Sequence, residues 1–304
     1  AGLAIAGMLN PSKEKRQKFR VWIGEGANGK STLNSLIENT LGFNDYGYIG
    51  KCSSTLLTRK KQDSASANPE LYKNLCEKKR IVLLTEPDKS DKLNADLMKE
   101  LSGGDTLTCR SLYKDTEGFK DPSCRWILSC NNFPQVGLGH AIWRRVSVIE
   151  FPSKFISRDQ KIENPTIEFY RDNSINSKIK NEWCMEFFHL LMKYYRQWQT
   201  EWKYDLKEPI EVKKFTNEYE KKFNLLIKFI DECLELSDST DIVPINKRQF
   251  KSLYKEWCNQ SNNEKPSAQD LEDYFNDSRF KKNAKGITNY ITKGEQDERN
   301  NIMI

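Results

Sequence analysis

Short, almost continuous apolar stretches recur along the first half of the chain, and such stretches are typical of strands buried within a sheet. They lie at 20–23, 80–86, 124–130 and 146–151. Between them, 32–41 and 91–101 place apolar residues three or four positions apart, which is the period of a helix. The alternation predicts an α/β fold. Residues 102–113 predict a sharp turn and a further strand, and 114–123 predict a charged hairpin tip.

Helical patterns dominate the second half of the chain. The region 156–204 predicts a polar loop followed by a helix, whose aromatic and aliphatic stripe we assign to a core and not to a base-stacking surface. The stripe contains Ile179, Trp183, Phe187, Leu190, Leu191, Tyr194 and Trp198. Beyond a boundary at Pro209, the region 210–236 predicts one long amphipathic helix, and Asn246 and Ser267 are predicted to cap two more.

The C-terminal tail is basic around a turn at Gly286. Its cationic residues are Arg279, Lys281, Lys282, Lys285 and Lys293. Three helices followed by a basic two-stranded element predict a winged-helix-like domain that contacts DNA through phosphates. A small packing domain with solvated surface charges remains an equal alternative.

A glycine-rich segment follows the first apolar stretch and precedes the first helical pattern. Its residues fit the phosphate-loop pattern G-x-x-x-x-G-K-[ST] from Gly24 to Ser31. The predicted nucleotide-binding residues are Gly24, Glu25, Gly26, Ala27, Asn28, Gly29, Lys30, Ser31 and Thr32. The glycines let backbone N–H groups point at phosphate oxygens, Lys30 supplies a cation, and the Ser31 hydroxyl is a ligand for Mg²⁺. The helix that begins there adds the positive end of its dipole.

Polar residues stand at the ends of later strands. Glu86 ends the second apolar stretch and Asn131 follows the third. An acid at such a position holds the Mg²⁺ shell or polarises the attacking water, and an amide beside it orients that water. The pair Arg144 and Arg145 precedes the fourth stretch, where it is surface charge, a structural salt bridge, or a finger that reaches the γ-phosphate bound to a neighbouring subunit.

Composition limits the remaining possibilities. The 304 residues carry a formal net charge of +6, which permits nucleic-acid binding without demonstrating it. Eight cysteines without a C-x-x-C pair and only two histidines argue against a zinc site and favour a soluble intracellular protein with reduced thiols. Nothing resembles a membrane span or a signal peptide. The chain begins with Ala, and we expect it to be a piece of a longer polypeptide.

Five motifs in a fixed order carry a resemblance to a known family. They are the phosphate loop, 85–88 (Thr-Glu-Pro-Asp), 101–105 (Leu-Ser-Gly-Gly-Asp), 129–134 (Ser-Cys-Asn-Asn-Phe-Pro) and 142–145 (Ile-Trp-Arg-Arg). Together they resemble the superfamily 3 helicases, and most of all the poxvirus-type primase–helicase group of large DNA viruses, phages and plasmids. The likeness is close over residues 1–155 and looser beyond.

The resemblance implies an AAA+-like P-loop ATPase that hydrolyses ATP with Mg²⁺ between the subunits of a homohexameric ring around DNA. It implies the end of a preceding helical segment at 1–18, the ATPase domain at 19–155, a helical lid or extension at 156–208 and a winged-helix-like domain at 209–304. It leaves room for a primase domain before residue 1. If the source is a virus, it implies a replication site in the cytoplasm.

The resemblance also implies a role for each residue that falls at a family motif position. Glu86 falls at the catalytic acid, Asn131 at the polar sensor, and Arg145 at the arginine finger that acts on the neighbouring subunit, with Arg144 in reserve. Lys114 falls at the hairpin lysine that touches the DNA backbone, although a solvated hairpin charge explains it as well.

One position departs from the family. Many relatives place two acids side by side where this chain has Thr85 before Glu86, so the Mg²⁺ contact rests on Ser31 and Glu86, with Asp88 as a substitute.

The sequence therefore predicts an ATP-dependent DNA helicase module that acts on single-stranded or forked DNA in viral or mobile-element replication. A DNA-binding initiator or switch of the same fold, which binds ATP without unwinding, is the alternative. A small-molecule kinase would use the same phosphate loop, but the paired arginines would then have no evident purpose.

Overall fold

The computed structural model describes residues 18–43, 47–58, 71, 74, 79–87, 92–103, 107–110, 117–120, 124–136, 140–237, 243–261, 266, 268–277 and 279–293. Among the sequence predictions, residues 1–17, Asp88, Lys114 and Ser267 lie outside these ranges. The described residues form two units, and the boundary between them falls after Thr216, inside a helix.

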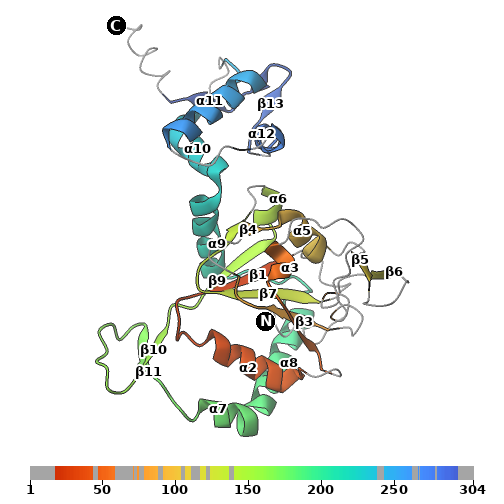
Figure 1. Ribbon diagram of the computed structural model, residues 1–304, viewed down its shortest axis with the longest axis vertical. Coiled ribbons are helices and arrows are strands. Elements are labelled where there is room, and N and C mark those ends of the chain that lie inside the picture. Colours follow the sequence, from red (N-terminus) through yellow and green to blue (C-terminus); the bar gives the residue numbers. More distant parts are fainter. Residues whose placement is uncertain are drawn as a thin grey trace. The chain divides into compact units, whose positions relative to one another are not determined.

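A five-stranded parallel sheet is the centre of the first unit (Figure 1). Its strands, in spatial order, are β2 (Ile49–Cys52), β3 (Ile81–Leu84), β7 (Arg125–Cys130), β1 (Phe19–Ile23) and β9 (Val146–Glu150). The four predicted apolar stretches became β1, β3, β7 and β9, and the α/β fold is confirmed. Their residues are almost all buried because helices cover both faces.

The two faces of the sheet use alternate residues of each strand. Trp22, Ile127 and Leu83 pack against α2 (Lys30–Leu41) and α8 (Cys184–Thr200). On the opposite face the Trp126 Nε1 donates a hydrogen bond of 3.1 Å to the Leu101 carbonyl in α5 (Ala95–Gly103). The prediction of a helix over 91–101 was wrong at its start, since residues 92–93 form strand β4.

Short elements connect this framework. They are α3 (Thr55–Thr58), β4 (Lys92–Leu93), which pairs in parallel with β8 (Gln135–Val136), and α6 (His140–Trp143). The predicted strand in 102–113 is β5 (Leu107–Arg110), which pairs antiparallel with β6 (Glu117–Lys120) inside the predicted hairpin tip.

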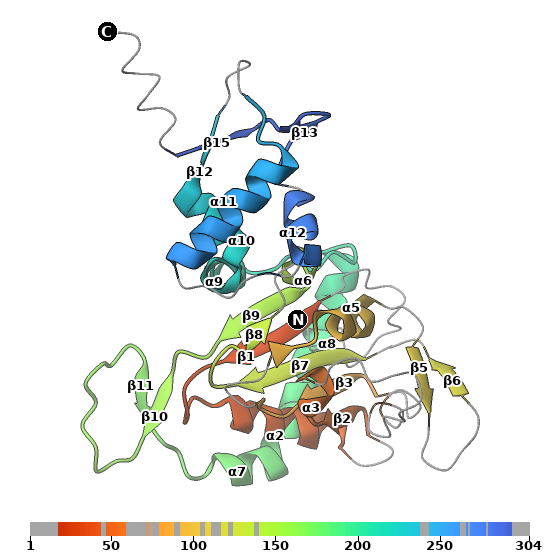
Figure 2. The same ribbon diagram turned by 45° about the horizontal axis from the view of Figure 1, so that its top comes forward.

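An ordered excursion follows β9 and was predicted only as a polar loop. Strands β10 (Lys154–Ile156) and β11 (Glu168–Tyr170) pair in parallel, and the chain returns through α7 (Ile175–Lys178) and the π-helical turn η2 (Ile179–Trp183) into α8. Figure 2 shows the excursion extending from the sheet next to the start of α2.

The aromatic stripe of α8 and η2 is divided between core and surface. Ile179, Leu191 and Trp198 are buried, whereas Trp183 and Leu190 are exposed. The core assignment therefore holds for only part of the stripe.

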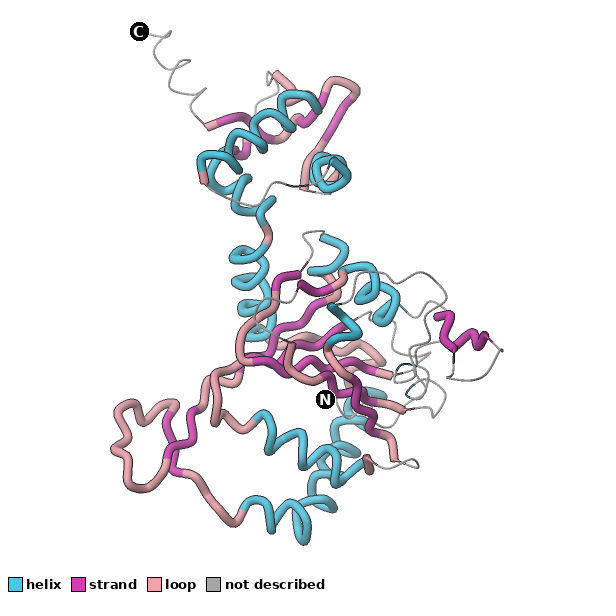
Figure 3. The backbone as a smooth tube through the Cα atoms, in the orientation of Figure 1, coloured by secondary structure: helices cyan, strands magenta, loops and turns pink. Residues whose placement is uncertain are grey.

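The second unit is built from helices and short antiparallel strand pairs (Figure 3). After α9 (Ile210–Phe223) it contains α10 (Leu225–Cys233), β12 (Leu234–Leu236), α11 (Lys247–Gln260), α12 (Ala268–Phe275), β13 (Lys282–Asn283), β14 (Gly286–Ile287) and β15 (Tyr290–Thr292). Strand β12 pairs with β15 and β13 with β14.

The prediction of one helix over 210–236 was wrong. Asn224 adopts an extended conformation, and its side chain accepts a hydrogen bond from the Leu226 N–H at 3.1 Å. This cap starts a new helix, and the chain turns into β12 after Cys233.

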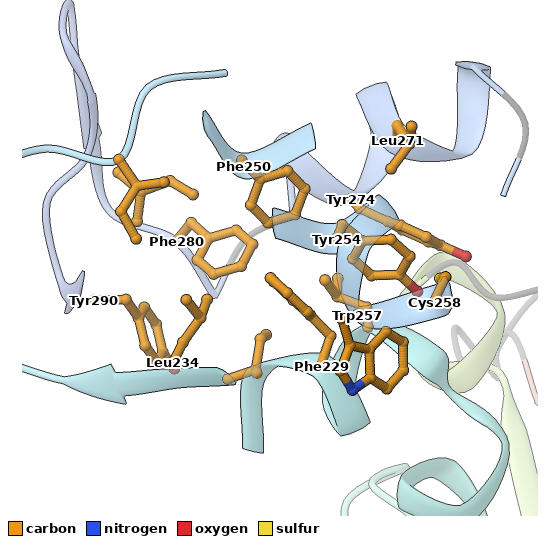
Figure 4. Packing of buried hydrophobic residues seen from close by; sticks show 14 residues of the cluster. Phe229, Leu234, Phe250, Tyr254, Trp257, Cys258, Leu271, Tyr274, Phe280 and Tyr290 are labelled. Atoms are coloured by element: carbon orange, nitrogen blue, oxygen red, sulfur yellow. The ribbon is translucent and has the colours of Figure 1, made fainter. Parts of the chain in front are cut away.

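The core of the second unit is aromatic. Phe229, Phe250, Tyr254, Trp257 and Phe280 converge in it, and Figure 4 shows them as sticks. Phe250 is fully buried, and its ring centroid lies 5.6 Å from those of Phe229 and Phe280, with the rings edge-on. Such contacts stabilise the unit beyond simple area burial.

Candidate functional site

The order of the strands brings three loops to one edge of the sheet. Strand β7 lies between β1 and β3, although it follows both in sequence, and all three run parallel. The residues after their carboxyl ends are Gly24, Asn131 and Thr85 with Glu86. Ligands of open α/β sheets bind at this edge.

The glycine loop from Gly24 to Gly29 has tight packing and an unusual backbone. Ala27 and Gly29 have φ angles of 60° and 90°, in the left-handed region that favours glycine. A Cβ at Gly24 would lie 2.0 Å from the Asn28 Nδ2 and 2.7 Å from the Phe151 carbonyl oxygen. Helix α2 begins directly after Gly29, a residue with no side chain to cover the first N–H groups of the helix.

Lys30 points back into the loop. Its residue is 7% exposed, and its Nζ donates to the Gly24 carbonyl, to the Asn28 Oδ1 at 3.2 Å and to the Asn131 Oδ1 at 3.4 Å. Burial lowers the pKa of Lys30, and the nearby Cys130 and Glu86 oppose that shift. The cation is therefore held beneath the loop by neutral oxygens.

Asn131 joins Lys30 to Glu86. Its backbone N–H donates to the Glu86 Oε1 at 2.8 Å, and its Nδ2 donates to the Oε2 at 3.1 Å. Both carboxylate oxygens are thus fixed, while the Glu86 side chain stays exposed to solvent. Cation, amide and carboxylate form one continuous hydrogen-bonded row.

Thr85, which stands where many relatives have an acid, has a structural contact. Its Oγ1 accepts a hydrogen bond of 3.1 Å from the Ser54 N–H, and the Ser54 Oγ donates to the Glu86 carbonyl at 3.3 Å. These bonds tie the end of β3 to the loop after β2.

A cleft of about 620 Å³, which we call the phosphate cleft, opens over this row. It is lined by Gly26, Ala27, Asn28, Lys30, Ser31, Asn34, Ser35, Glu38, Lys51, Leu83, Leu84, Thr85, Glu86, Ser129 and Asn131. The exposed Ser31 hydroxyl and the Glu86 carboxylate therefore border the same space. Of the predicted loop residues, Gly24, Glu25, Gly29 and Thr32 are not part of its lining.

The two arginines have different environments. Both lie in the turn between α6 and β9, where Arg144 is exposed and Arg145 is only 9% exposed. The Arg145 carbonyl accepts from the Phe19 N–H at 2.7 Å. Neither lines the phosphate cleft.

The remaining sequence predictions concern two further residues, metal binding and membrane spans. Asp88 and Lys114 lie outside the described residues. Within the described ranges, no group of three histidine, cysteine or acidic side chains is arranged to hold a metal ion. No helix there is long and apolar enough to span a bilayer.

Sequence reasoning missed the positioning role of Asn28 and the contribution of Lys51 and Glu38. Asn28 is buried, and its Oδ1 lies 3.2 Å from the Lys30 Nζ. Lys51 pairs with Glu38 at 2.9 Å on the far wall of the cleft. Of these three residues, only Asn28 could have been found from the sequence, because it is a polar residue inside the glycine loop.

The chain is similar to viral proteins along most of its length, although no family model matches it. A protein of Acanthamoeba polyphaga mimivirus named "Putative helicase" is 34% identical over 94% of this chain and 30% of its own length. A "Putative helicase" of Frog virus 3 is 29% identical over 72% of this chain and 22% of its own. A "Putative primase" of African swine fever virus is 26% identical over 83% of this chain and 26% of its own. The chain thus spans less than a third of the length of these relatives.

A more distant similarity exists among solved structures. The apo C-terminal region of NrS-1 aligns with 62% of this chain and 40% of that one, at 18% identity and a TM-score of 0.44.

Proposed function

Since this chain is a homologue of proteins that large DNA viruses carry under the names helicase and primase, we propose that it is the ATP-dependent motor module of a DNA helicase in viral or mobile-element replication. In this proposal 19–155 is an AAA+-like ATPase domain, 156–208 a helical lid or extension, and 209–304 a winged-helix-like domain. The observation that carries the proposal is the hydrogen-bonded row of Lys30, Asn131 and Glu86 beneath a glycine loop.

The glycine loop fits the triphosphate of ATP. The absence of a Cβ at Gly24 lets Asn28 pack beneath the loop, where it holds the Lys30 ammonium. When phosphate oxygens arrive, they replace the neutral oxygens around that ammonium as its partners. The N–H groups at the start of α2 and the helix dipole favour the same negative charge.

The donor set also fits Mg²⁺. The Ser31 hydroxyl and the Glu86 carboxylate border the same cleft and are hard oxygen ligands. When bound, the ion neutralises charge on the phosphate oxygens. Thr85 contributes no carboxylate, whereas many relatives have two adjacent acids at this point. We therefore assign one acidic ligand fewer to the ion in this chain. Asp88 is the candidate to replace the missing acid.

Glu86 and Asn131 are the proposed catalytic residues within one subunit. The carboxylate accepts two hydrogen bonds from Asn131 and retains lone pairs for an attacking water. The amide of Asn131 thereby fixes the orientation of the base, and its Oδ1 faces the Lys30 ammonium that binds phosphate.

The arginine pair supplies the proposed contribution of a neighbouring subunit in a homohexameric ring. An arginine finger of this kind is worth about 10³–10⁵ in rate. Arg145 is the assignment that the family resemblance implies, and Arg144 is the residue of the pair that is exposed. Mixed assemblies of variants would separate the two.

DNA contact is assigned to two places. Lys114 of the hairpin is proposed to follow one strand. In the second unit, Lys281 precedes β13 and Lys285 lies in the β13–β14 turn, and both are exposed, which is suited to phosphate contact. Helix α12 contains two aspartates, a glutamate and no basic residue, and its Glu272 carboxylate is paired with Lys247 and Lys251. We therefore assign DNA contact in this unit to the hairpin and not to α12.

The test is the rate of ATP hydrolysis per subunit as a function of protein concentration, with and without single-stranded DNA. We expect the rate to rise with both, because the active site is shared between subunits. Lys30→Ala should abolish hydrolysis. A rate that is independent of concentration and of DNA would contradict the proposal and favour a kinase-like monomer.

Unwinding of a forked duplex separates the helicase from the alternative, a DNA-binding initiator or switch that binds ATP without unwinding. Glu86 held by Asn131 is the observation that favours the switch, since both oxygens of the carboxylate accept hydrogen bonds from Asn131. Strand separation by the wild-type chain that is lost in Lys30→Ala would favour the helicase.

A further inference from the structure

A second cleft, of about 540 Å³, lies on the other side of the glycine loop. One wall is formed by Ala27, Gly29 and Thr32, and the opposite wall by Phe155 of β10 together with residues that follow β11. Figures 1 and 2 both show the β10–β11 excursion beside the start of α2.

The second cleft adjoins the phosphate cleft. Ala27 lines both, and Thr32 of the second cleft directly follows Ser31 of the first. A ligand that passes over the loop at Ala27 therefore enters both spaces. Of the predicted loop residues, Gly29 and Thr32 line only the second cleft.

The excursion is attached to the loop by specific contacts. The Phe155 N–H donates to the Ala27 carbonyl at 2.7 Å, and the Phe155 carbonyl accepts from the Arg171 Nε at 2.9 Å. A Cβ at Gly29 would lie 3.4 Å from the Phe155 ring. The aromatic side chain is thus held in van der Waals range of the loop.

The far wall is also built, by a turn around Asp172. Its carboxylate accepts from the Ser174 N–H at 2.9 Å, from the Ser174 Oγ at 2.6 Å and from the Lys178 Nζ at 3.0 Å. These bonds hold the pKa of Asp172 well below its usual range. The turn presents the exposed residues Asn173 and Asn176 at the cleft.

The chemistry of this lining suits a nucleoside. An aromatic ring offers a face on which a base can stack. An asparagine amide carries a donor and an acceptor side by side, which matches the edge of adenine. Arg171 lines the cleft as well, but its Nε donates to the Phe155 carbonyl, and the ionised Asp172 carboxylate next to it disfavours a phosphate on this wall.

We infer that the second cleft binds the base and ribose of the nucleotide whose triphosphate occupies the phosphate cleft, with Phe155 as the stacking wall and Asn173 and Asn176 as the residues that select adenine. The inference rests on the proposed function and adds to it the specificity of the site. Phe155, Asn173 and Asn176 are binding residues and take no part in the chemistry.

The test is calorimetric binding of two probes, ATP and inorganic tripolyphosphate, each with Mg²⁺. Tripolyphosphate carries the phosphates without a nucleoside. We expect Phe155→Ala to weaken ATP roughly tenfold while tripolyphosphate binds as it does to wild type. Unchanged tripolyphosphate binding also demonstrates that the variant is folded. Phe155→Leu, which keeps most of the apolar volume, should weaken ATP as well.

Tyr170→Ala is the matched control. Tyr170 is an aromatic residue of β11 in the same excursion, is 46% exposed and does not line the second cleft. This variant should bind ATP as wild type does. Asn173→Ala combined with Asn176→Ala should bind ATP and GTP equally, whereas wild type should prefer ATP several-fold.

The outcomes separate this inference from the proposed function. ATP binding by Phe155→Ala at wild-type strength, or an equal loss for both probes, would overturn the nucleoside cleft while the phosphate cleft stands. A wild-type chain that binds neither probe would overturn the proposed function and the inference with it.

Discussion

Gly24 and Gly26 lie two positions apart in the glycine loop, but only Gly26 has room for a side chain. A Cβ at Gly24 would collide with Asn28 and with the Phe151 carbonyl, whereas nothing lies within 4 Å of a Cβ at Gly26. Gly24→Ala should displace Asn28 and with it the Lys30 ammonium. We expect at least a tenfold loss of ATP affinity in Gly24→Ala and a change of less than threefold in Gly26→Ala, measured by calorimetry. Equal losses in both variants would contradict this account.

Arg144 and Arg145 are neighbours with opposite exposure, which predicts opposite effects on stability. Truncation of the buried Arg145 removes the packing of its stem, and we expect Arg145→Ala to lower the free energy of unfolding by about 1–3 kcal/mol. Arg144→Ala should stay within about 0.5 kcal/mol of wild type. Urea unfolding measures both.

The hydrolysis rate then distinguishes the two candidates for the arginine finger. A folded variant that binds ATP, hydrolyses none alone and regains hydrolysis when mixed with Lys30→Ala chains, whose own arginines are intact, identifies the finger. Full hydrolysis by the Arg145 variant would remove Arg145 from that role. Full hydrolysis by both variants would remove the finger from the proposal.

A buried thiol predicts a dependence of stability on alkaline pH. Burial raises the pKa of Cys124 from 9.0 to about 12. Between these values the unfolded chain has lost this proton and the folded chain has kept it, so the free energy of unfolding falls as pH rises. The fall from this thiol is about 1.4 kcal/mol per pH unit. Cys124→Ala should reduce the slope by that amount in urea unfolding between pH 9 and 11; a slope equal to that of wild type would show that the thiol is not buried.

Among the elements, helix α11 begins with a capping box that tests the second unit. The Asn246 side chain accepts from the Arg248 and Gln249 N–H groups, each at 3.0 Å, and the Gln249 side chain accepts from the Asn246 N–H at 3.0 Å. Asn246→Ala should cost about 1 kcal/mol of stability, because it leaves these N–H groups to water. Asn246→Asp keeps the acceptor and should be near wild type. Equal stability of all three chains would contradict the cap.

The sequence predicted the type of most elements because apolar period and capping residues are local signals. Strands β1, β3, β7 and β9 followed from apolar stretches, and the Asn246 cap from its residue type. The break at Asn224 was missed because the apolar period continues across it. The order of the strands in the sheet could not be predicted, because the apolar pattern of a buried strand does not specify which strands pair with it.

The same distinction applies to the site. Lys30, Glu86 and Asn131 could be named from motifs, but their connection depends on β7 lying between β1 and β3. The second cleft was not predicted because Phe155 and Asn176 lie in a segment with no motif, and only folding places them beside Gly29. The difference in solvent exposure between Arg144 and Arg145 could not be predicted from the local sequence either.

At the scale of the whole molecule, each unit has its own core. The first is built around the sheet with α2 and α8, and the second around the aromatic residues of α10, α11 and the tail. The boundary falls within α9, after Thr216, whose Oγ1 accepts from the Val148 N–H at 2.9 Å. Two cores predict two unfolding transitions, so each free energy of unfolding belongs to the unit that contains the substituted residue.

The two transitions should respond to different perturbations. Both proposed nucleotide clefts lie in the first unit, so ATP with Mg²⁺ at 100 times its Kd should stabilise only that unit, by about 2.7 kcal/mol. Phe250 is fully buried in the second unit, and Phe250→Ala should lower only the other transition, by about 3–5 kcal/mol. Calorimetric scans of both chains with and without nucleotide measure this. If Phe250→Ala shifted both transitions equally, the two units would share one cooperative core. If ATP shifted only the transition that Phe250→Ala lowers, nucleotide would bind to the second unit, and the assignment of the clefts to the first unit would be wrong.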